Sequence, residues 1–238
     1  FSNYNSLKIC LLNKQGNKKN KIALIGNSHI QMYVPSIIPF LKKKSLQAIL
    51  LSTTGCLPTL NINIGETCFK KTNKQFKKYA DDASINTIII ATTWLNNQLY
   101  DGSKYIKNDP LVLANSLVNL VKSLEEKNKK VYLIGPIQRP NYDLPQDLSR
   151  LIKFGHIKIS EIEKEIKVKK EVFNKNYDQT IILLKKELNE NFIDTTDTFC
   201  NEEFCFLADE KGSYFADDGH LSKYGASLFI NRFENVFK

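Results

Sequence analysis

Short apolar runs alternate along this chain with longer stretches whose apolar residues recur at helical spacing. Several of the short runs are apolar throughout instead of alternating with polar residues. That pattern is typical of strands covered on both faces in a parallel sheet. The predicted strands are Lys21–Ile25, Gln47–Ser52, Thr87–Thr92, Val131–Ile134 and, shorter, Asn191–Ile193.

The stretches between and after these runs have the pattern of amphipathic helices. Pro35 and Pro39 predict a bend or a break in the first of them. Arg139–Ile159 contains two further prolines, and we expect it to be an irregular surface segment. The predicted helices are Ile30–Lys44, Lys71–Ala83, Pro110–Lys127, Ile159–Asn189 and Ser222–Phe237.

This alternation of strands and helices predicts an α/β fold, a three-layer α/β/α sandwich with a mainly parallel sheet. No repeat and no linker divides the chain, so we expect residues 1–238 to form a single domain. The chain begins with Phe1 instead of Met, and we therefore expect it to be an excised piece of a longer protein.

Composition and charge narrow the class of partner. Hydrophobic residues make up 42% of the chain, enough for a sizeable core, and no apolar run is long enough to span a membrane. The net charge of +9 is compatible with nucleic acid, a membrane surface or an acidic glycan. The lysines are spread along the chain without the interleaved aromatic residues of single-strand binders. We favour a compositional bias toward Lys, Asn and Ile, and we expect no nucleic-acid partner.

Four of the five cysteines form two local pairs in the sequence. Cys56 and Cys68 flank a turn-rich segment, and Cys200 and Cys205 lie close together. Three interpretations are open: two disulfides, which we favour, zinc ligation, and free thiols. Disulfides would indicate an oxidising compartment. Cys10 is left over, and we expect it to pack as a small apolar side chain.

Ligands of open parallel sheets bind beyond the carboxyl ends of the strands, so the residues that follow each strand are the first candidates for a site. The first strand is followed by Gly26, Asn27 and Ser28. Gly26 permits a tight turn, and Ser28 then stands at the start of a helix, a suitable place for a nucleophile. Asn27, next to it, is a candidate for substrate binding. The alternative is that Asn27 or Ser28 only caps the helix.

Two more strand ends carry candidates. Gly55 follows the second strand and can offer its N–H to a ligand, although an ordinary turn glycine is the simpler interpretation. Trp94, the only tryptophan, follows the third strand and either lines a cleft or belongs to the core.

Near the C-terminus, Asp217 and His220 are separated by one turn that contains a glycine. At this spacing the carboxylate can accept a hydrogen bond from the imidazole and fix its tautomer, so that the other ring nitrogen can take a proton from a serine. Ser28, Asp217 and His220 together form a plausible nucleophilic set. The alternative is an Asp-Gly turn in front of a capped helix.

These residues resemble the blocks of the SGNH hydrolases, also called GDSL-like esterases. The segment Ile22–His29 is similar to their Gly-Asp-Ser-His block, with Asn27 in the place of Asp, and Asp217–Ser222 is similar to their Asp-x-x-His block. The resemblance implies a flavodoxin-like strand order. It also implies Ser28 as nucleophile, His220 as base, Asp217 as its orienting carboxylate, and the N–H groups of Ser28 and Gly55 as oxyanion donors.

The third block departs from the family pattern. The usual Gly-x-Asn is replaced by Ala91-Thr92-Thr93-Trp94, and Asn96 is out of register, which leaves one oxyanion donor without a candidate. A block that ends in Trp resembles the SGNH domains fused to bacterial membrane acyltransferases of the acyltransferase-three type. The cysteine pairs Cys56–Cys68 and Cys200–Cys205 are similar to that subfamily too, and there they imply disulfides.

The resemblance implies acyl transfer, with acetyl the expected group, to hydroxyls of a bacterial surface glycan such as lipopolysaccharide, through an acyl-serine. An acyl donor and a membrane acyltransferase domain of the same longer chain are the implied partners. The implied location is periplasmic, tethered to the inner membrane. No metal or organic cofactor is needed, and the sequence predicts no oligomeric state. The alternatives are a carbohydrate O-acetyl esterase with the same site and a catalytically weak glycan-binding module.

Overall fold

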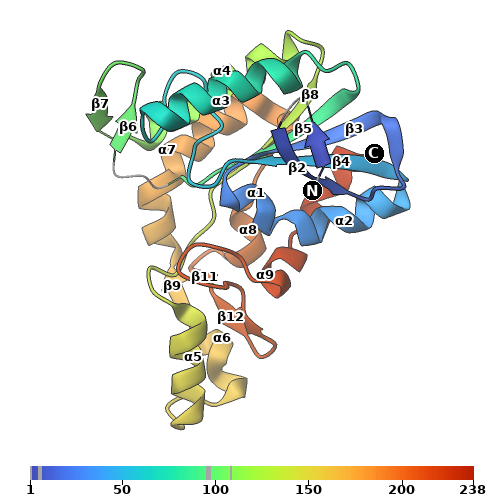
Figure 1. Cartoon of the computed structure of the whole chain (residues 1–238). Helices are drawn as coiled ribbons and strands as arrows, with labels where there is room; N and C mark the ends of the chain where they lie inside the picture. The colour runs from blue at the N-terminus through green and yellow to red at the C-terminus, as the bar shows by residue number, and fades with distance from the viewer. Residues whose placement is uncertain (1, 5–6, 95–97, 108) are drawn as a thin grey trace.

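The structure is a computed structural model that describes residues 2–4, 7–94, 98–107 and 109–238. Within these residues a seven-stranded sheet runs through the middle of the molecule, in the order β1-β2-β4-β3-β5-β8-β10 (Figure 1). Its strands are β1 (Ser2–Tyr4), β2 (Leu7–Leu12), β3 (Asn17–Gly26), β4 (Leu46–Ser52), β5 (Ile85–Ala91), β8 (Lys130–Ile134) and β10 (Phe192–Ile193).

The central five strands are parallel. β3 pairs with β4 on one side and β5 on the other, and β8 pairs with β5 and β10. Taken in chain order, these strands lie as 2-1-3-4-5 across the sheet, which is the flavodoxin-like order. The predicted α/β class with a mainly parallel sheet is confirmed. β2 and β1 extend the sheet in the antiparallel sense, and we did not predict them.

Helices cover both faces of the sheet, which explains why its strands are apolar throughout. In β3, Ala23 and Ile25 face one core layer, and Ile22 and Leu24 face the other. The first layer is closed by α3, α4 and α7, and the second by α1, α2 and the C-terminal elements (Figure 1). The helices are α1 (Ser28–Met32), α2 (Val34–Lys43), α3 (Glu66–Ala80), α4 (Pro110–Glu125), α5 (Leu144–Lys153), α6 (Ile162–Glu165), α7 (Lys170–Leu188), α8 (Thr196–Phe199) and α9 (Lys223–Ser227), with 3-10 turns η1 (Ile159–Glu161), η2 (Asn189–Asn191) and η3 (Ile230–Phe237).

The predicted break in the first helix is confirmed, because α1 ends before Tyr33 and α2 starts with Pro35 in its first turn. The final helix was predicted too long. Its regular part ends at Ser227, and a 3-10 segment follows that buries Phe233 and Phe237 against the sheet.

Two predictions around the middle of the chain were wrong. The segment expected to be irregular contains α5, whose Pro145 stands in the first turn, where the missing N–H breaks no helical hydrogen bond. The long helix begins at Lys170, because the residues before it form β9 (Lys167–Lys169), which pairs with β11 (Phe204–Phe206). A pairing between distant segments here overrides the local helical pattern.

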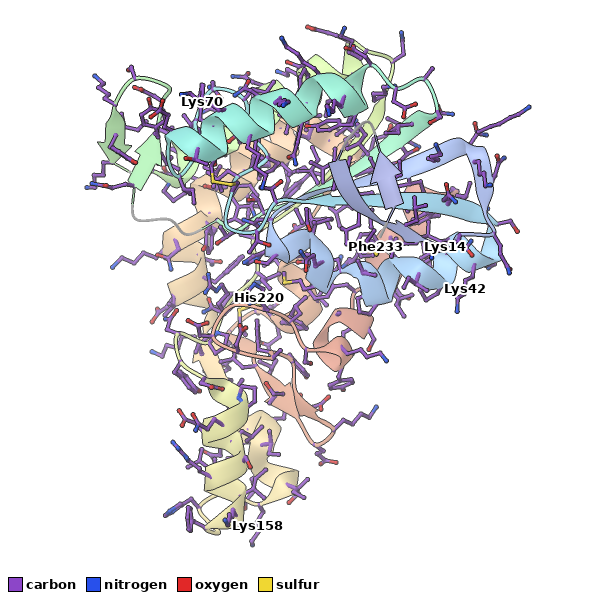
Figure 2. All side chains as sticks on the ribbon, in the orientation of Figure 1. Lys14, Lys42, Lys70, Lys158, His220 and Phe233 are labelled. Atoms are coloured by element: carbon purple, nitrogen blue, oxygen red, sulfur yellow. A yellow bond between two sulfur atoms is a disulfide. The ribbon has the colours of Figure 1, made fainter. Side chains whose placement is uncertain are left out.

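Smaller hairpins lie outside the main sheet. β6 (Gln98–Tyr100) pairs with β7 (Tyr105–Lys107), and β12 (Ala208–Asp209) pairs with β13 (Gly212–Ser213). Together with α5, α6, β9 and β11, the second hairpin builds a lobe that projects from the sheet (Figure 1). Lysine side chains extend into solvent over widely separated parts of the surface (Figure 2). No helix in the described part of the chain is long and apolar enough to cross a bilayer.

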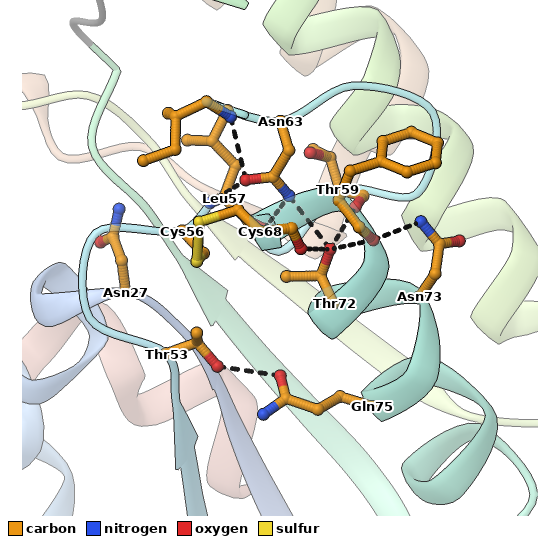
Figure 3. The surroundings of a disulfide bond; sticks show 12 residues. Asn27, Thr53, Cys56, Leu57, Thr59, Asn63, Cys68, Thr72, Asn73 and Gln75 are labelled. Carbon is orange, nitrogen blue, oxygen red and sulfur yellow. Dashed lines mark hydrogen bonds between the residues drawn. A yellow bond between two sulfur atoms is a disulfide. The ribbon is translucent and has the colours of Figure 1, made fainter. Parts of the chain in front are cut away.

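Both predicted disulfides are present, Cys56–Cys68 and Cys200–Cys205, and Cys10 is a free, half-buried thiol. The first disulfide joins the loop after β4 to the first turns of α3 (Figure 3). In the same loop the buried amide of Asn63 accepts a hydrogen bond from the N–H of Leu57 and donates one to its carbonyl oxygen. The loop that carries Gly55 is therefore held by covalent and hydrogen bonds.

Candidate active site

The turn that carries Ser28 follows directly from β3. Gly26 ends the strand with a φ of 155°, and a Cβ there would lie 1.8 Å from the carbonyl oxygen of Ala91 in β5. Only glycine permits so close an approach. Asn27 then caps α1, because its Oδ1 accepts a hydrogen bond of 3.0 Å from the N–H of His29. Ser28 is the first residue of that helix, at the carboxyl edge of the sheet.

Hydrogen bonds connect this turn to both neighbouring strand ends. The carbonyl oxygen of Gly26 accepts a hydrogen bond of 2.8 Å from the N–H of Thr53, after β4. The Nδ2 of Asn27 donates one of 3.1 Å to the hydroxyl of Thr92, after β5. Asn27 is almost fully buried. We predicted Asn27 near the substrate, but its side chain is engaged inside the protein, and it positions Ser28.

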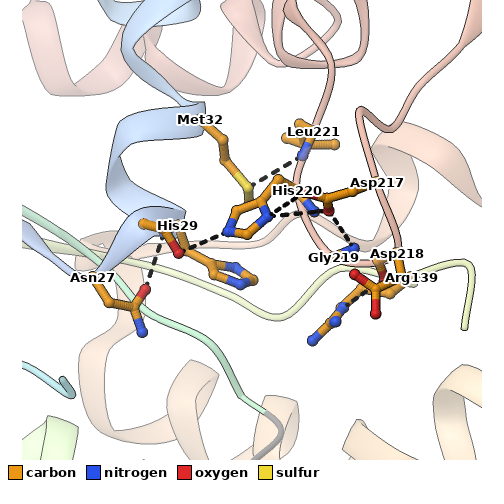
Figure 4. Close-up of polar contacts among 10 residues, drawn as sticks. Asn27, His29, Met32, Arg139, Asp217, Asp218, Gly219, His220 and Leu221 are labelled. Carbon is orange, nitrogen blue, oxygen red and sulfur yellow. Dashed lines mark hydrogen bonds and ion pairs between the residues drawn. The ribbon is translucent and has the colours of Figure 1, made fainter. Parts of the chain in front are cut away.

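The turn from Asp217 to His220 is organised around one carboxylate (Figure 4). Oδ1 of Asp217 accepts hydrogen bonds of 2.7 Å from the N–H groups of Gly219 and His220. Its Oδ2 lies 2.8 Å from Nδ1 of the His220 ring. The carboxylate therefore both builds the turn and orients the imidazole.

His220 connects this turn to the nucleophile candidate. Its Nε2 lies 2.7 Å from Oγ of Ser28, although the two residues are 192 positions apart in the chain. Because the Asp217 carboxylate accepts a hydrogen bond from Nδ1–H, Nε2 carries no proton and can accept the serine proton. The structure thus brings together the three residues that we predicted, in the order carboxylate, imidazole, hydroxyl.

The surroundings keep Asp217 ionised. Partial burial alone would raise the pKa of its carboxyl group, but the hydrogen bonds from the Gly219 N–H, the His220 ring and the His220 N–H outweigh burial and lower it. An ionised carboxylate stabilises the imidazolium that forms when His220 takes a proton.

A sequence profile described as "SGNH domain (fused to AT3 domains)" matches residues 2–235 of the chain. The chain belongs to this SGNH family. The family match and the fold together make it an SGNH-type enzyme of the class that transfers or hydrolyses acyl groups.

The SGNH domain is also similar to solved structures. The periplasmic domain of a lipopolysaccharide acetyltransferase from Salmonella ser. Paratyphi A is 16% identical, with a TM-score of 0.64 over 94% of this chain and 86% of that one. A putative acylhydrolase from Bacteroides fragilis is 13% identical, with a TM-score of 0.46 over 94% of this chain and 89% of that one. No curated protein sequence matches the chain.

In the SGNH domain the second strand end carries Gly55, in a turn closed by a hydrogen bond from the Cys56 N–H to the carbonyl oxygen of Thr53. Gly55 has a φ of 77°, and no atom lies within 4 Å of the place of a Cβ. Glycine is required here by the backbone conformation and not by crowding. Among the described residues the Gly55 N–H has no hydrogen-bond partner, so it is free to donate to a ligand.

The third strand end differs from the family pattern, as the sequence showed. The hydroxyl of Thr92 accepts the hydrogen bond from Asn27 described above. Asn96 lies outside the described residues. Trp94 is buried in the core layer next to α4 and α7, and it also lines a cavity beside the site. Both of the alternatives that we considered for this tryptophan, core and cleft, therefore hold.

His29 follows Ser28 in the chain, and its place beside His220 was not predicted. Its ring lies 5.3 Å from the ring of His220, centroid to centroid. Burial, and after it the charges of His220 and Arg139, lower the pKa of His29 to about 3. His29 is therefore neutral at physiological pH, and it places no charge beside His220.

Arg139 was also missed. It lies beyond the carboxyl end of β8, the same edge of the sheet that yielded the other candidates, but we assigned it to a surface segment. Its Nε donates a hydrogen bond of 3.2 Å to the carbonyl oxygen of Asp218 (Figure 4). The guanidinium covers Gly219, where a Cβ would lie 2.5 Å from Nη2. Arg139 thus holds the turn that carries His220.

Within the described residues no group of three or more His, Cys, Asp or Glu side chains is arranged to hold a metal ion. The chemistry that the site offers is that of a serine hydroxyl, an imidazole and a carboxylate.

Proposed function

We propose that this SGNH domain transfers an acyl group, acetyl in the simplest case, to a hydroxyl of a bacterial surface glycan through an acyl-Ser28 intermediate. The observation that carries the proposal is the hydrogen-bonded series from Asp217 through His220 to Ser28, with distances of 2.8 and 2.7 Å. These distances are in the range expected for a nucleophile and its general base.

The reaction has two steps. His220 takes the proton of Ser28 as Oγ attacks the acyl carbonyl carbon of the donor, and the imidazolium then protonates the leaving group as its bond to the acyl carbon breaks. In the second step a sugar hydroxyl gives its proton to His220 and attacks the acyl-serine, and Ser28 recovers its proton as it leaves. The N–H groups of Ser28 and Gly55 are the proposed donors to the oxyanion in both steps.

The comparisons with known proteins support the proposed glycan acceptor, the proposed membrane domain and the proposed location. The matched family is described as fused to AT3 domains, which supports a membrane acyltransferase domain as the partner in the longer chain. The Salmonella relative in fold is a lipopolysaccharide acetyltransferase periplasmic domain, which supports a glycan acceptor outside the cytoplasm. The two disulfides support the same location, because disulfides persist in oxidising compartments.

A second candidate function is a carbohydrate O-acetyl esterase. His220 and Asp217 are substantially exposed, with 38% and 47% of their side chains accessible. Water can therefore reach the acyl-serine and replace the sugar as acceptor. Supplying an acceptor separates the two functions, because a transferase forms acetylated glycan and an esterase releases only acetate.

The purified domain with a chromogenic acetyl ester tests the site. We expect hydrolysis that falls at least about 10³-fold in Ser28→Ala and in His220→Ala. Ser149→Ala and His156→Ala change an exposed serine and an exposed histidine of the projecting lobe and should leave the rate unchanged. Undiminished activity of Ser28→Ala would rule out this nucleophile. A wild-type domain that neither hydrolyses the ester nor reacts with a fluorophosphonate serine probe would contradict the catalytic assignment.

A further inference from the structure

A small cavity lies beside the catalytic residues. It is bounded by α1 and by the ends of β5 and β8, and its wall includes His29, Met32, Tyr33, Trp94, Arg139 and Tyr177. Its volume is about 10 Å³, which is room for roughly one water-sized group. The cavity can therefore accept one end of a substrate group but not a whole sugar ring.

Two buried hydrogen-bonding groups of this wall are unused. The Nε1 of Trp94 and the hydroxyl of Tyr33 have no hydrogen-bond partner within the described part of the chain. Both side chains are at least 95% buried, with exposed fractions of 5% and 1%. Burying such a group without a partner is unfavourable. Trp94 and Tyr33 both belong to the wall of the cavity.

The same wall carries a positive charge that no side chain compensates. Arg139 uses Nε on the Asp218 carbonyl, and no carboxylate of the described residues forms an ion pair with it. The neighbouring His29 is neutral, because its pKa is lowered to about 3. A half-buried guanidinium without a counter-charge favours an anion from outside the protein. Its planar fork matches the two oxygens of a carboxylate.

We propose that this cavity and the guanidinium of Arg139 form a subsite for the carboxylate of an acidic sugar in the glycan acceptor. The carboxylate pairs with the guanidinium of Arg139, and one of its oxygens enters the cavity beside Trp94. The sugar ring stays outside, with its hydroxyls beside Ser28. The inference rests on the proposed acyl transfer to a glycan, and it names the chemical class of that glycan.

The fluorescence of Trp94 reports binding directly, because it is the only tryptophan of the chain and lines the cavity. The Ser28→Ala variant is used so that nothing turns over. We expect sodium glucuronate to change the emission saturably, and methyl glucoside and sodium chloride at equal ionic strength to leave it unchanged. The glucuronate affinity should fall at least tenfold when Arg139→Gln is added.

Arg150→Gln is the matched control, because Arg150 is an exposed arginine of α5 that pairs with Asp147. It should bind glucuronate as well as its parent. Arg139→Lys keeps the charge and loses the fork, and it should bind weakly but measurably. Circular dichroism identifies any variant that has not folded. The proposal is overturned if glucuronate gives no saturable change, if methyl glucoside binds equally well, or if folded Arg139→Gln binds like its parent.

Binding and catalysis fail separately in this design. A domain that binds glucuronate but shows no Ser28-dependent ester hydrolysis keeps the subsite and contradicts the proposed reaction. A domain that hydrolyses the ester but does not bind glucuronate keeps the reaction and loses the subsite.

Discussion

Asp217 both shapes a turn of the backbone and orients the ring of His220. One of its oxygens accepts two backbone hydrogen bonds that shape the turn, and the other accepts the hydrogen bond from His220. Structure and chemistry can be separated here, because an asparagine can still accept the backbone bonds. Its amide nitrogen would then face Nδ1 of the ring as a donor and favour the wrong tautomer.

For Asp217→Asn we therefore expect a folded protein with turnover reduced by a factor on the order of 10²–10⁴. Ester hydrolysis at saturating substrate measures the effect. Asp218→Asn is the control, because the structure uses the carbonyl oxygen of Asp218. Turnover of Asp217→Asn within twofold of the wild type would mean that this carboxylate does not orient His220.

The buried, neutral His29 is expected to make the stability of the protein depend on pH. Its ring titrates near 6.5 in the unfolded chain, and in the folded protein burial, His220 and Arg139 lower its pKa to about 3. Below pH 6.5 the unfolded state binds a proton that the folded state does not, so stability is lost as the pH falls from 6.5 toward 3. The largest slope for one such group is about 1.4 kcal/mol per pH unit.

We expect the free energy of unfolding in urea to fall more steeply between pH 7.5 and pH 5 in the wild type than in His29→Gln. The expected difference is about 1–2 kcal/mol. His156→Gln, at an exposed histidine, should behave like the wild type. Parallel pH profiles of the wild type and His29→Gln would contradict a buried neutral His29.

Among the elements, the loop between β4 and α3 depends most on a covalent bond. Cys56–Cys68 fixes this loop to α3, and the loop carries Gly55, a proposed oxyanion donor. Cys200–Cys205 closes a shorter loop that runs into β11, and this loop carries none of the proposed site residues. The two bonds therefore affect stability in similar ways and catalysis differently.

For Cys56→Ser with Cys68→Ser we expect a loss of roughly 2–3 kcal/mol in the free energy of unfolding and a lower turnover number. For Cys200→Ser with Cys205→Ser we expect a loss of roughly 2 kcal/mol and an unchanged turnover number for the folded fraction. Urea unfolding and ester hydrolysis at a temperature where both variants are folded measure the two effects. Equal effects on turnover would contradict a special role of the first loop.

On the scale of the whole molecule, one sheet is shared by both core layers. Alternate residues of β3 and β5 belong to the two layers, so neither layer can form without the sheet. The projecting lobe is attached through Leu144 and Leu148 of α5, which are buried in the second layer. This arrangement predicts that residues 1–238 unfold as a single unit.

We expect one cooperative transition in urea, with the same midpoint by Trp94 fluorescence and by far-ultraviolet circular dichroism. Trp94 reports the first core layer, and the dichroism reports all helices, including those of the lobe. Two transitions with different midpoints would mean that the lobe or the C-terminal elements form a separate domain.

Local patterns in the sequence determined the parallel sheet, most of the helices and the positions of Ser28, Asp217 and His220. They could do so because a strand pattern, a cap and a turn depend on residues close together in the chain. The same patterns failed at β9, which we predicted to be part of a helix. This strand forms because it pairs with β11, whose residues are far away in the sequence.

Only the tertiary structure decided that Asn27 positions Ser28, that His29 is neutral and that Arg139 lines a cavity together with Trp94. Each of these properties depends on burial and on contacts between the ends of separate strands. The sequence alone does not give the distances between residues on separate strands. The proposed catalytic residues could therefore be found from motifs, whereas the burial and the contacts around them came from the packing.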